Sequence, residues 1–167
     1  STATHAHPLL SLPAMPMAFI TMTIDDQPLD VDDGIYLIQG SIINVSSVAA
    51  FYPDTSLAGY CAAKAALDMV TKTYAFTYAS KGVRVNSINP AVINTPIFET
   101  NLGMKPEQVE ALGPMMALGR VGKPEEVAAT IAFLSSKGAG FITGETLAVD
   151  GGAMLTRWLN FKALLTQ

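Results

Sequence analysis

The sequence predicts an α/β fold, and three observations support this. After residue 40, short runs rich in β-branched residues alternate with segments of helical apolar spacing. The connections between them are short, and strands that alternate with helices in this way usually form a parallel sheet covered by helices. Half of the 167 residues are hydrophobic and only 14% are charged, against about 25% in ordinary soluble domains. We therefore expect one small α/β unit, part of whose surface is covered by another chain.

Charge divides the chain near Gln39. Residues 1–39 contain five acidic residues and no lysine or arginine, with one glycine and no asparagine, whereas the rest of the chain is nearly balanced in charge. We therefore expect three parts. They are an irregular arm with a β-hairpin over 1–39, the α/β unit over 40–152, and a tail over 153–167 that is a candidate interface.

The hairpin is predicted from the pattern of the first part. Pro, Ala, Ser and Met without periodicity indicate the arm over 1–17. Weak alternation over 19–24 precedes turn residues, and apolar residues then return over 29–38. The strand that follows the junction would otherwise leave an open hydrogen-bonding edge. We expect residues 19–38 to pair with that edge or to pack over it.

The first elements of the α/β unit are two strands and a long helix. Residues 41–45 are a short apolar run rich in β-branched side chains, which is typical of a strand. Over 57–79, Leu67, Val70 and Tyr74 recur at helical spacing among alanines, and a glycine follows as a stop signal. Residues 83–88 then predict a second strand.

Proline and glycine delimit the later elements. Residues 94–113 indicate a loop with a short helix over 106–111. Pro124, followed by two glutamates, predicts a helix that begins there and continues to about Lys137. Residues 145–149 predict the last strand.

Composition excludes several classes of partner. The net charge of −4, without a basic cluster, argues against nucleic-acid binding. No uncharged apolar run reaches the roughly 18–20 residues that span a bilayer, so no membrane segment is expected. The single cysteine, Cys61, excludes an internal disulfide and indicates a reducing, cytoplasmic location. No metal site is expected, because His5 and His7 lie in the irregular arm and the acidic turn lacks the spacing of a calcium loop.

Two residues of the long helix indicate acid/base chemistry. Tyr60 and Lys64 are four residues apart and so share one face. A free tyrosine has a pKa of about 10, too high for a base at neutral pH. A nearby ammonium group, with a second positive charge such as an oxidised nicotinamide, would favour the phenolate and make the tyrosine a usable acid/base. Ser47 follows the strand 41–45, at the end where open α/β sheets bind ligands, and its hydroxyl could hold a substrate carbonyl oxygen.

These residues lie in five stretches, which are GSIINVSS (40–47), YCAAK (60–64), KGVRVNSINPAVINTP (81–96), GRVGKPEEVAATIAFLSS (119–136) and FITGETLAVDGG (141–152). In this order and spacing they resemble the short-chain dehydrogenase/reductase family over about two-thirds of the chain. The resemblance implies the carboxyl-terminal half of a Rossmann-like, doubly wound parallel sheet. It also implies an oxidoreductase that uses NAD or NADP to interconvert an alcohol and a ketone or aldehyde.

The resemblance also assigns roles to residues. Ser47 is expected to hydrogen-bond the substrate oxygen, Tyr60 to be the catalytic acid/base, and Lys64 to lower the pKa of that tyrosine and to contact the nicotinamide ribose. The turn that holds the carboxamide and a phosphate matches Pro90, Ile93 and Thr95, and the variable substrate loop supplies Phe98, Leu102 and Met104. Relatives often assemble through the last strand with its preceding helix and through the tyrosine helix, so a homo-oligomer is expected.

Residues 1–39 depart from the family pattern. With one glycine before residue 40 they contain no G-x-x-x-G-x-G turn, and without an asparagine they lack the residue that completes the family's proton relay. The residue that selects NAD or NADP is absent as well. Three hypotheses stay open, which are the oxidoreductase, an inactive truncated remnant that acts as an oligomerisation or interaction module, and a chain that works beside another chain supplying the missing half.

Overall fold

The computed structural model describes residues 19–20, 40–54 and 56–156. Its centre is one sheet with the strand order β1-β2-β3-β4. The strands are Phe19–Ile20 (β1), Gly40–Val45 (β2), Val83–Pro90 (β3) and Thr146–Val149 (β4). β2, β3 and β4 are parallel, and β1 pairs antiparallel with β2. The α/β class and the parallel sheet that the sequence predicts are thus confirmed.

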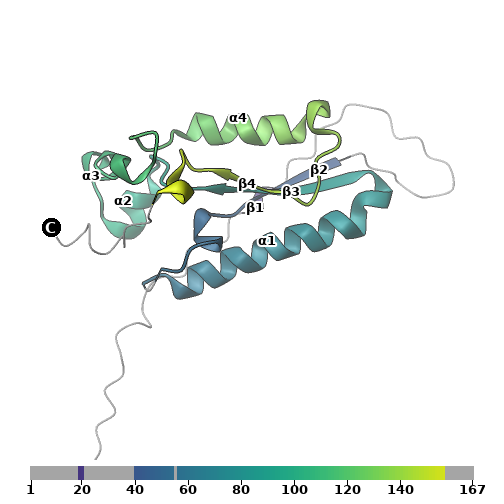
Figure 1. Cartoon of the computed structure of the whole chain (residues 1–167), viewed down its shortest axis with the longest axis horizontal. Helices are drawn as coiled ribbons and strands as arrows, with labels where there is room; N and C mark the ends of the chain where they lie inside the picture. Colours follow the sequence, from purple (N-terminus) through teal and green to yellow (C-terminus); the bar gives the residue numbers. More distant parts are fainter. Residues whose placement is uncertain (1–18, 21–39, 55, 157–167) are drawn as a thin grey trace, which may run out of the picture.

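Two helices cover the sheet. Figure 1 shows α1 (Ala58–Tyr78) along one face and α4 (Pro124–Ser135) along the other. Both begin and end within two residues of their predicted bounds. The short helix α3 (Pro106–Glu110) also lies where it was expected, but the loop before it contains a further helix, α2 (Ile97–Leu102), that the sequence pattern did not predict.

The amino-terminal segment is described only at β1. Phe19 pairs with Asn44 and Ile20 with Ile43, so this dipeptide occupies part of the outer edge of β2. This agrees with the expectation that the segment pairs with that edge. The rest of the predicted arm and hairpin, and the tail beyond residue 156, lie outside the described residues.

The two faces of the sheet differ in polarity. On the α4 side, Ile43, Ile88 and Leu134 are buried in one apolar cluster. On the α1 side the contacts are polar, because Asn44 donates to the Thr71 hydroxyl at 2.9 Å and further hydrogen bonds follow towards the end of β3. Apolar burial therefore holds α4, whereas hydrogen bonds orient much of the contact between α1 and the sheet.

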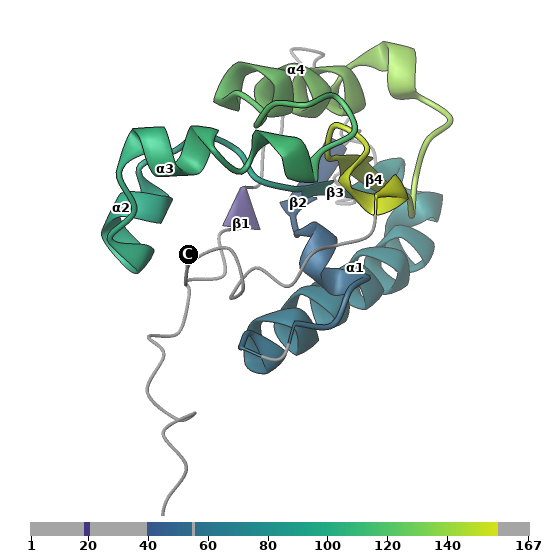
Figure 2. The same ribbon diagram turned by 60° about the vertical axis from the view of Figure 1, so that its left-hand side comes forward.

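A second apolar cluster lies beyond the carboxyl ends of the strands. Figure 2 shows α2 and α3 grouped there, away from the long helices. Their lobe is filled by buried apolar side chains from the loop region and from the segment after β4, which are Val92, Met104, Val109, Leu112, Met115, Met116, Val121 and Ala153. This lobe forms a wall beside the end of the sheet.

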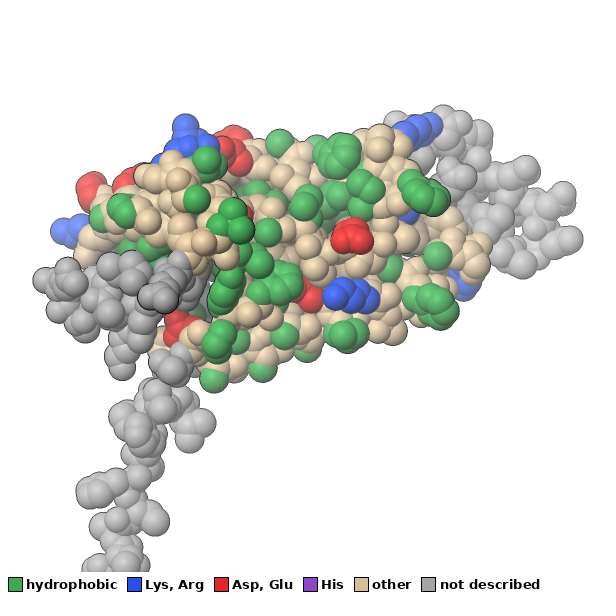
Figure 3. All heavy atoms as spheres, viewed as in Figure 1, with side chains coloured by type: hydrophobic (Ala, Val, Ile, Leu, Met, Phe, Trp, Pro, Cys, Tyr) green, Lys and Arg blue, Asp and Glu red, His purple; other side chains and the backbone are tan. Residues whose placement is uncertain are grey.

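Much of the outer surface is apolar. Figure 3 shows hydrophobic side chains on one face of the molecule over both long helices, with few charges between them. On α1, Phe76 is 89% exposed and Met69 is 61% exposed. No helix in the described part of the chain has the length and apolarity to cross a membrane, and no group of three or more His, Cys, Asp or Glu residues there could hold a metal ion.

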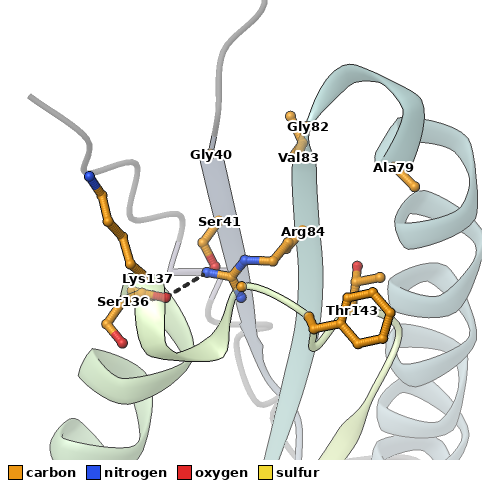
Figure 4. A pocket seen from close by; sticks show the side chains of 12 residues that line it. Gly40, Ser41, Ala79, Gly82, Val83, Arg84, Ser136, Lys137 and Thr143 are labelled. Atoms are coloured by element: carbon orange, nitrogen blue, oxygen red, sulfur yellow. Dashed lines mark hydrogen bonds between the residues drawn. The ribbon is translucent and has the colours of Figure 1, made fainter. Parts of the chain in front are cut away.

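A cavity of about 660 Å³ lies at the amino ends of β2 and β3. Arg84 projects from β3 into this region towards the backbone of Ser136, as Figure 4 shows. Its guanidinium group donates to the carbonyl oxygens of Leu134 at 2.7 Å, Ser136 at 3.2 Å and Ile142 at 3.3 Å. Since these are carbonyls at and after the end of α4, Arg84 has a structural role in ending that helix.

Candidate functional site

A second cavity lies at the opposite, carboxyl ends of the strands and has a volume of about 450 Å³. That volume is within the roughly 300–1,000 Å³ usual for small-molecule sites. Its wall comes from the end of β2, the start of α1, the turn after β3, α2 and α4. The residues that line it are Val45, Ser46, Ser47, Tyr60, Lys64, Pro90, Ala91, Ile93, Thr95, Ile97, Phe98, Leu102, Pro124, Val127, Ala128 and Ile131.

Lys64 is held against the end of β2 by two reciprocal hydrogen bonds. Its Nζ donates to the Val45 carbonyl at 2.8 Å, and the Ser46 hydroxyl donates to the Lys64 carbonyl at 3.2 Å. The ammonium group also lies 5.6 Å from the centre of the Tyr60 ring. Burial lowers the pKa of Lys64, and the negative charge of Asp68 opposes that change. The site therefore contains a fixed, largely buried cation beside the tyrosine.

Ser47 has two partners. It is the N-cap of the short 3₁₀ turn Val48–Ala50, where its side-chain oxygen accepts from the Ala49 N–H at 3.1 Å. Its side chain also forms a hydrogen bond with Tyr60. The cap fixes the direction of the serine side chain, and the bond to Tyr60 places the two hydroxyl groups together at the cavity wall.

Several opposing effects act on the pKa of Tyr60. Burial raises the pKa of Tyr60 and the nearby Cys61 thiol adds to the rise, while the hydrogen bond with Ser47 lowers it. The lowering expected from the sequence requires Lys64 together with a second positive charge, such as an oxidised nicotinamide, and stays a prediction. Burial raises this pKa because taking a phenolate out of water penalises its charge. In this structure the neutral phenol is favoured.

Most residues expected to bind cofactor or substrate line the same cavity. Pro90, Ile93 and Thr95 contribute from the turn after β3, and Phe98 and Leu102 contribute from α2. The turn is held in place by the Asn94 N–H, which donates to the Gly122 carbonyl at 2.9 Å, and by the Gly122 N–H, which donates to the Val92 carbonyl at 2.9 Å.

Met104 does not line this cavity. Its side chain is 4% exposed and belongs to the apolar cluster of the α2–α3 lobe. Gly103, which follows α2, has a φ of +64° and ends that helix, so Met104 lies outside α2. The expectation that Met104 faces a substrate is therefore corrected. Met104 comes directly after the glycine that ends α2, and its side chain is buried in the apolar cluster instead.

The structure adds residues that the motif spacing did not reveal. Asp68 and Asn89 are buried directly behind Lys64 and Ser47, and Val127, Ala128 and Ile131 of α4 complete the cavity wall. A signal for Asp68 was present, because it stands four residues after Lys64 and so shares its helix face. The α4 residues had no such signal, because their position depends on how α4 crosses the sheet.

Comparisons with known proteins agree with this geometry. The family model described as "Enoyl-(Acyl carrier protein) reductase" matches residues 33–154. The 3beta-hydroxysteroid dehydrogenase 1 of Eggerthella lenta is 47% identical over 116 residues, which are 70% of this chain and 44% of that protein.

Solved structures show the same similarity. The ligand-free aldohexose dehydrogenase of Thermoplasma acidophilum has a TM-score of 0.65 at 37% identity, covering 72% of this chain and 50% of that one. A 4-hydroxyisoleucine dehydrogenase complexed with NADH has a TM-score of 0.65 at 33% identity, covering 72% of this chain and 49% of that one. The chain thus spans about half the length of the relatives that it matches.

Proposed function

Since this chain belongs to the short-chain dehydrogenase/reductase family, we propose that it takes part in the NAD(P)(H)-dependent interconversion of an alcohol and a ketone or aldehyde. The observation that supports the proposal most directly is the cavity at the carboxyl ends of β2 and β3. Ser47, Tyr60 and Lys64 line it together, although they come from two different elements. A small-molecule carbonyl or alcohol is the substrate class that such a site suits.

The proposed roles follow from the contacts. The hydrogen bond between Ser47 and Tyr60 brings two hydroxyl groups to one point, where a carbonyl oxygen could accept from both. The Tyr60 hydroxyl would donate its proton to the oxygen as it becomes an alcohol, and burial, which raises the pKa of Tyr60, holds that proton until the transfer. Lys64, with its ammonium group 5.6 Å from the ring, would stabilise the phenolate that this leaves.

The chain's residues fit the nicotinamide end of a dinucleotide. Lys64, Ile93 and Thr95 line the cavity that also contains Tyr60, and the Thr95 side chain makes no hydrogen bond within the part of the chain that the structure describes. Ammonium and hydroxyl donors suit ribose, carboxamide and phosphate oxygens. When bound, a reduced nicotinamide supplies the hydride. Among the described residues no glycine-rich turn leads into a helix to cradle the pyrophosphate, so the proposal concerns the nicotinamide end.

Cofactor binding tests the proposal. We expect saturable binding when the chain is titrated with NADH or NADPH by isothermal titration calorimetry. We also expect Tyr60→Phe to retain that binding while the reduction of a panel of ketones and aldehydes falls by about 100-fold or more. Absence of binding up to millimolar concentrations of both cofactors would contradict the proposal.

A second candidate function is an interaction module without catalysis. The exposed apolar side chains support it, above all Met69 and Phe76 on α1, because a monomer rarely leaves so large an apolar surface in water. The calorimetric titration separates the candidates, since a module of this kind would bind partners but no dinucleotide.

A further inference from the structure

Three side chains of α1 lie in line behind the candidate site. Tyr60, Lys64 and Asp68 follow one another at intervals of four residues and therefore share one face of the helix. Tyr60 lines the cavity, whereas Lys64 and Asp68 are 5% and 6% exposed. A buried carboxylate is unfavourable unless hydrogen bonds and an opposite charge compensate for lost water. Asp68 therefore requires partners.

β3 supplies the hydrogen bonds to Asp68. The Ser87 hydroxyl donates to Oδ1 at 2.9 Å, and the Asn89 amide donates to Oδ2 at 2.8 Å. Ser87 and Asn89 are fully buried. Each carboxylate oxygen thus has its own donor from the strand that α1 crosses, and the side chain is held in one orientation.

Asn89 extends this contact to the strand end that carries Ser47. Its Nδ2 also donates to the Ser47 carbonyl at 3.0 Å, so both amide hydrogens have acceptors. These two acceptors define the orientation of the amide, and its Oδ1 is left buried without a hydrogen-bond partner. An unpaired buried oxygen is unfavourable for stability, so this arrangement favours the geometry of the site over satisfaction of every polar group.

We infer that Asp68 is a positioning residue of the site, which supplies a buried carboxylate one helical turn from Lys64 and, through Asn89, holds the segment that carries Ser47. The inference rests on the proposed function. Asp68 lies one helical turn beyond Lys64 and outside the cavity lining, so it is assigned a positioning role and not a catalytic one.

The charges around Lys64 support this role. On α1 its titratable neighbours are Tyr60 and Asp68, β2 offers the Val45 carbonyl, and β3 offers neutral side chains. The α4 residues that line the cavity carry no charge. Burial lowers the pKa of Lys64 and Asp68 raises it, so removal of the carboxylate charge should lower that pKa further.

The experiment is an NMR titration of the full chain with ¹³C-labelled lysine, with no cofactor present. The Lys64 signal is identified by its disappearance in Lys64→Arg. In Asp68→Asn, a nearly isosteric change, we expect the midpoint of Lys64 to move to lower pH than in the unmodified chain. An unchanged or higher midpoint in a folded Asp68→Asn variant would overturn the inference. Should that variant not fold, Asp68→Leu must show the same fall, and an unchanged midpoint there would overturn it equally.

Ser87→Ala is the matched control. It removes one hydrogen bond to Asp68 but leaves the charge, so the Lys64 midpoint should move clearly less than in Asp68→Asn. An equal fall in both variants would show that packing rather than charge governs Lys64, and would refute the inference. Failure of the proposed function is recognised separately, because it appears as absent cofactor binding in the unmodified chain while the titration remains measurable.

Discussion

At the scale of single residues, solvent exclusion decides the chemistry of the site. Tyr60 and Lys64 are spaced so that the cation can act on the phenol, yet burial is the largest influence on both and favours the neutral form of each. Tyr60 therefore holds its proton more tightly, and Lys64 less tightly, than each would in water. The surface pair Arg120 and Glu126 shows the opposite case. There the hydrogen bond between the two charged side chains, and not burial, is the largest influence on the pKa of each group.

The surface pair leads to a pH-dependent prediction. Arg120 contacts Glu126 at 2.6 Å, and this contact, with the Lys123 N–H, lowers the pKa of Glu126 from 4.5 to about 2. A lowered carboxyl pKa contributes stability above about pH 4.5 that is lost as the pH falls towards 2. We expect Glu126→Gln to lower the Tm slightly at pH 7 and to have a much smaller effect near pH 2. Thermal melts at both pH values check this, and the difference at pH 7 should shrink in high salt because both side chains are exposed.

At the scale of elements, the ends of helices depend on residues far away in the sequence. α4 ends at Ser135, and Arg84 from β3 donates to the carbonyls of Leu134 and Ser136 on either side of that end. The strand and the helix end are therefore fixed to each other. This contact is at the amino end of the sheet, so it stabilises the scaffold without touching the candidate site.

We expect Arg84→Lys to destabilise the chain. A lysine keeps the charge but cannot reach three separate carbonyls with a planar fork, and the unpaired groups should cost about 1–3 kcal/mol of unfolding free energy. Urea denaturation measures the loss. Arg120→Lys, at an exposed position, is the control and should change stability much less. Equal losses in the two variants would contradict the assigned role of Arg84.

Two glycines with positive φ allow the cost of backbone strain to be compared with the cost of a steric clash. Gly103 and Gly152 have φ values of +64° and +79°. A Cβ at Gly103 would meet nothing within 4 Å, whereas one at Gly152 would come 2.8 Å from the Ala117 Cβ. Gly103→Ala should therefore cost about 1 kcal/mol from strain alone. Gly152→Ala should cost about 2 kcal/mol or more because a steric clash is added. Denaturant melts that rank the two in the reverse order would contradict this reading.

At the scale of the whole molecule, the uncovered apolar surface is the main feature. Exposed hydrophobic side chains lie on α1, on α4 and on β4, and include Val70, Tyr74, Phe133 and Leu147. Surfaces of this kind usually mark a contact with another protein. With the candidate site at one end of the sheet, such a contact can form along the helices without blocking the cavity.

We expect the chain to form a homo-oligomer through this surface. Light scattering after size-exclusion chromatography should give a mass that is a multiple of the chain mass. Phe76→Asp, at a side chain that is 89% exposed, should reduce that mass without unfolding the chain. Lys72→Asp, a charge change at an exposed position of the same helix, is the control. A monomer in the unmodified chain would contradict the prediction.

The features that were predicted from the sequence are those that depend on residues close together along the chain. β2, α1, β3, α4 and β4 were predicted because their apolar periods and their Pro and Gly signals lie within each segment. α2 was missed because a helix of six residues has too few turns to show a period. Among the site residues, Ser47, Tyr60 and Lys64 were found by their spacing. Met104 was assigned to the cavity wall, but it is buried in the apolar cluster of the α2–α3 lobe, after the left-handed cap at Gly103 has ended α2.

By itself the sequence determined the family, the order of the elements and the face of α1 that carries Tyr60 and Lys64, since these follow from short-range spacing. Only the tertiary structure decided the direction of the Tyr60 pKa, the burial of Met104 and the contact of Asp68 and Asn89 with the site. These properties depend on how completely water is excluded and on which strand crosses which helix. Both result from packing between residues that are distant along the chain.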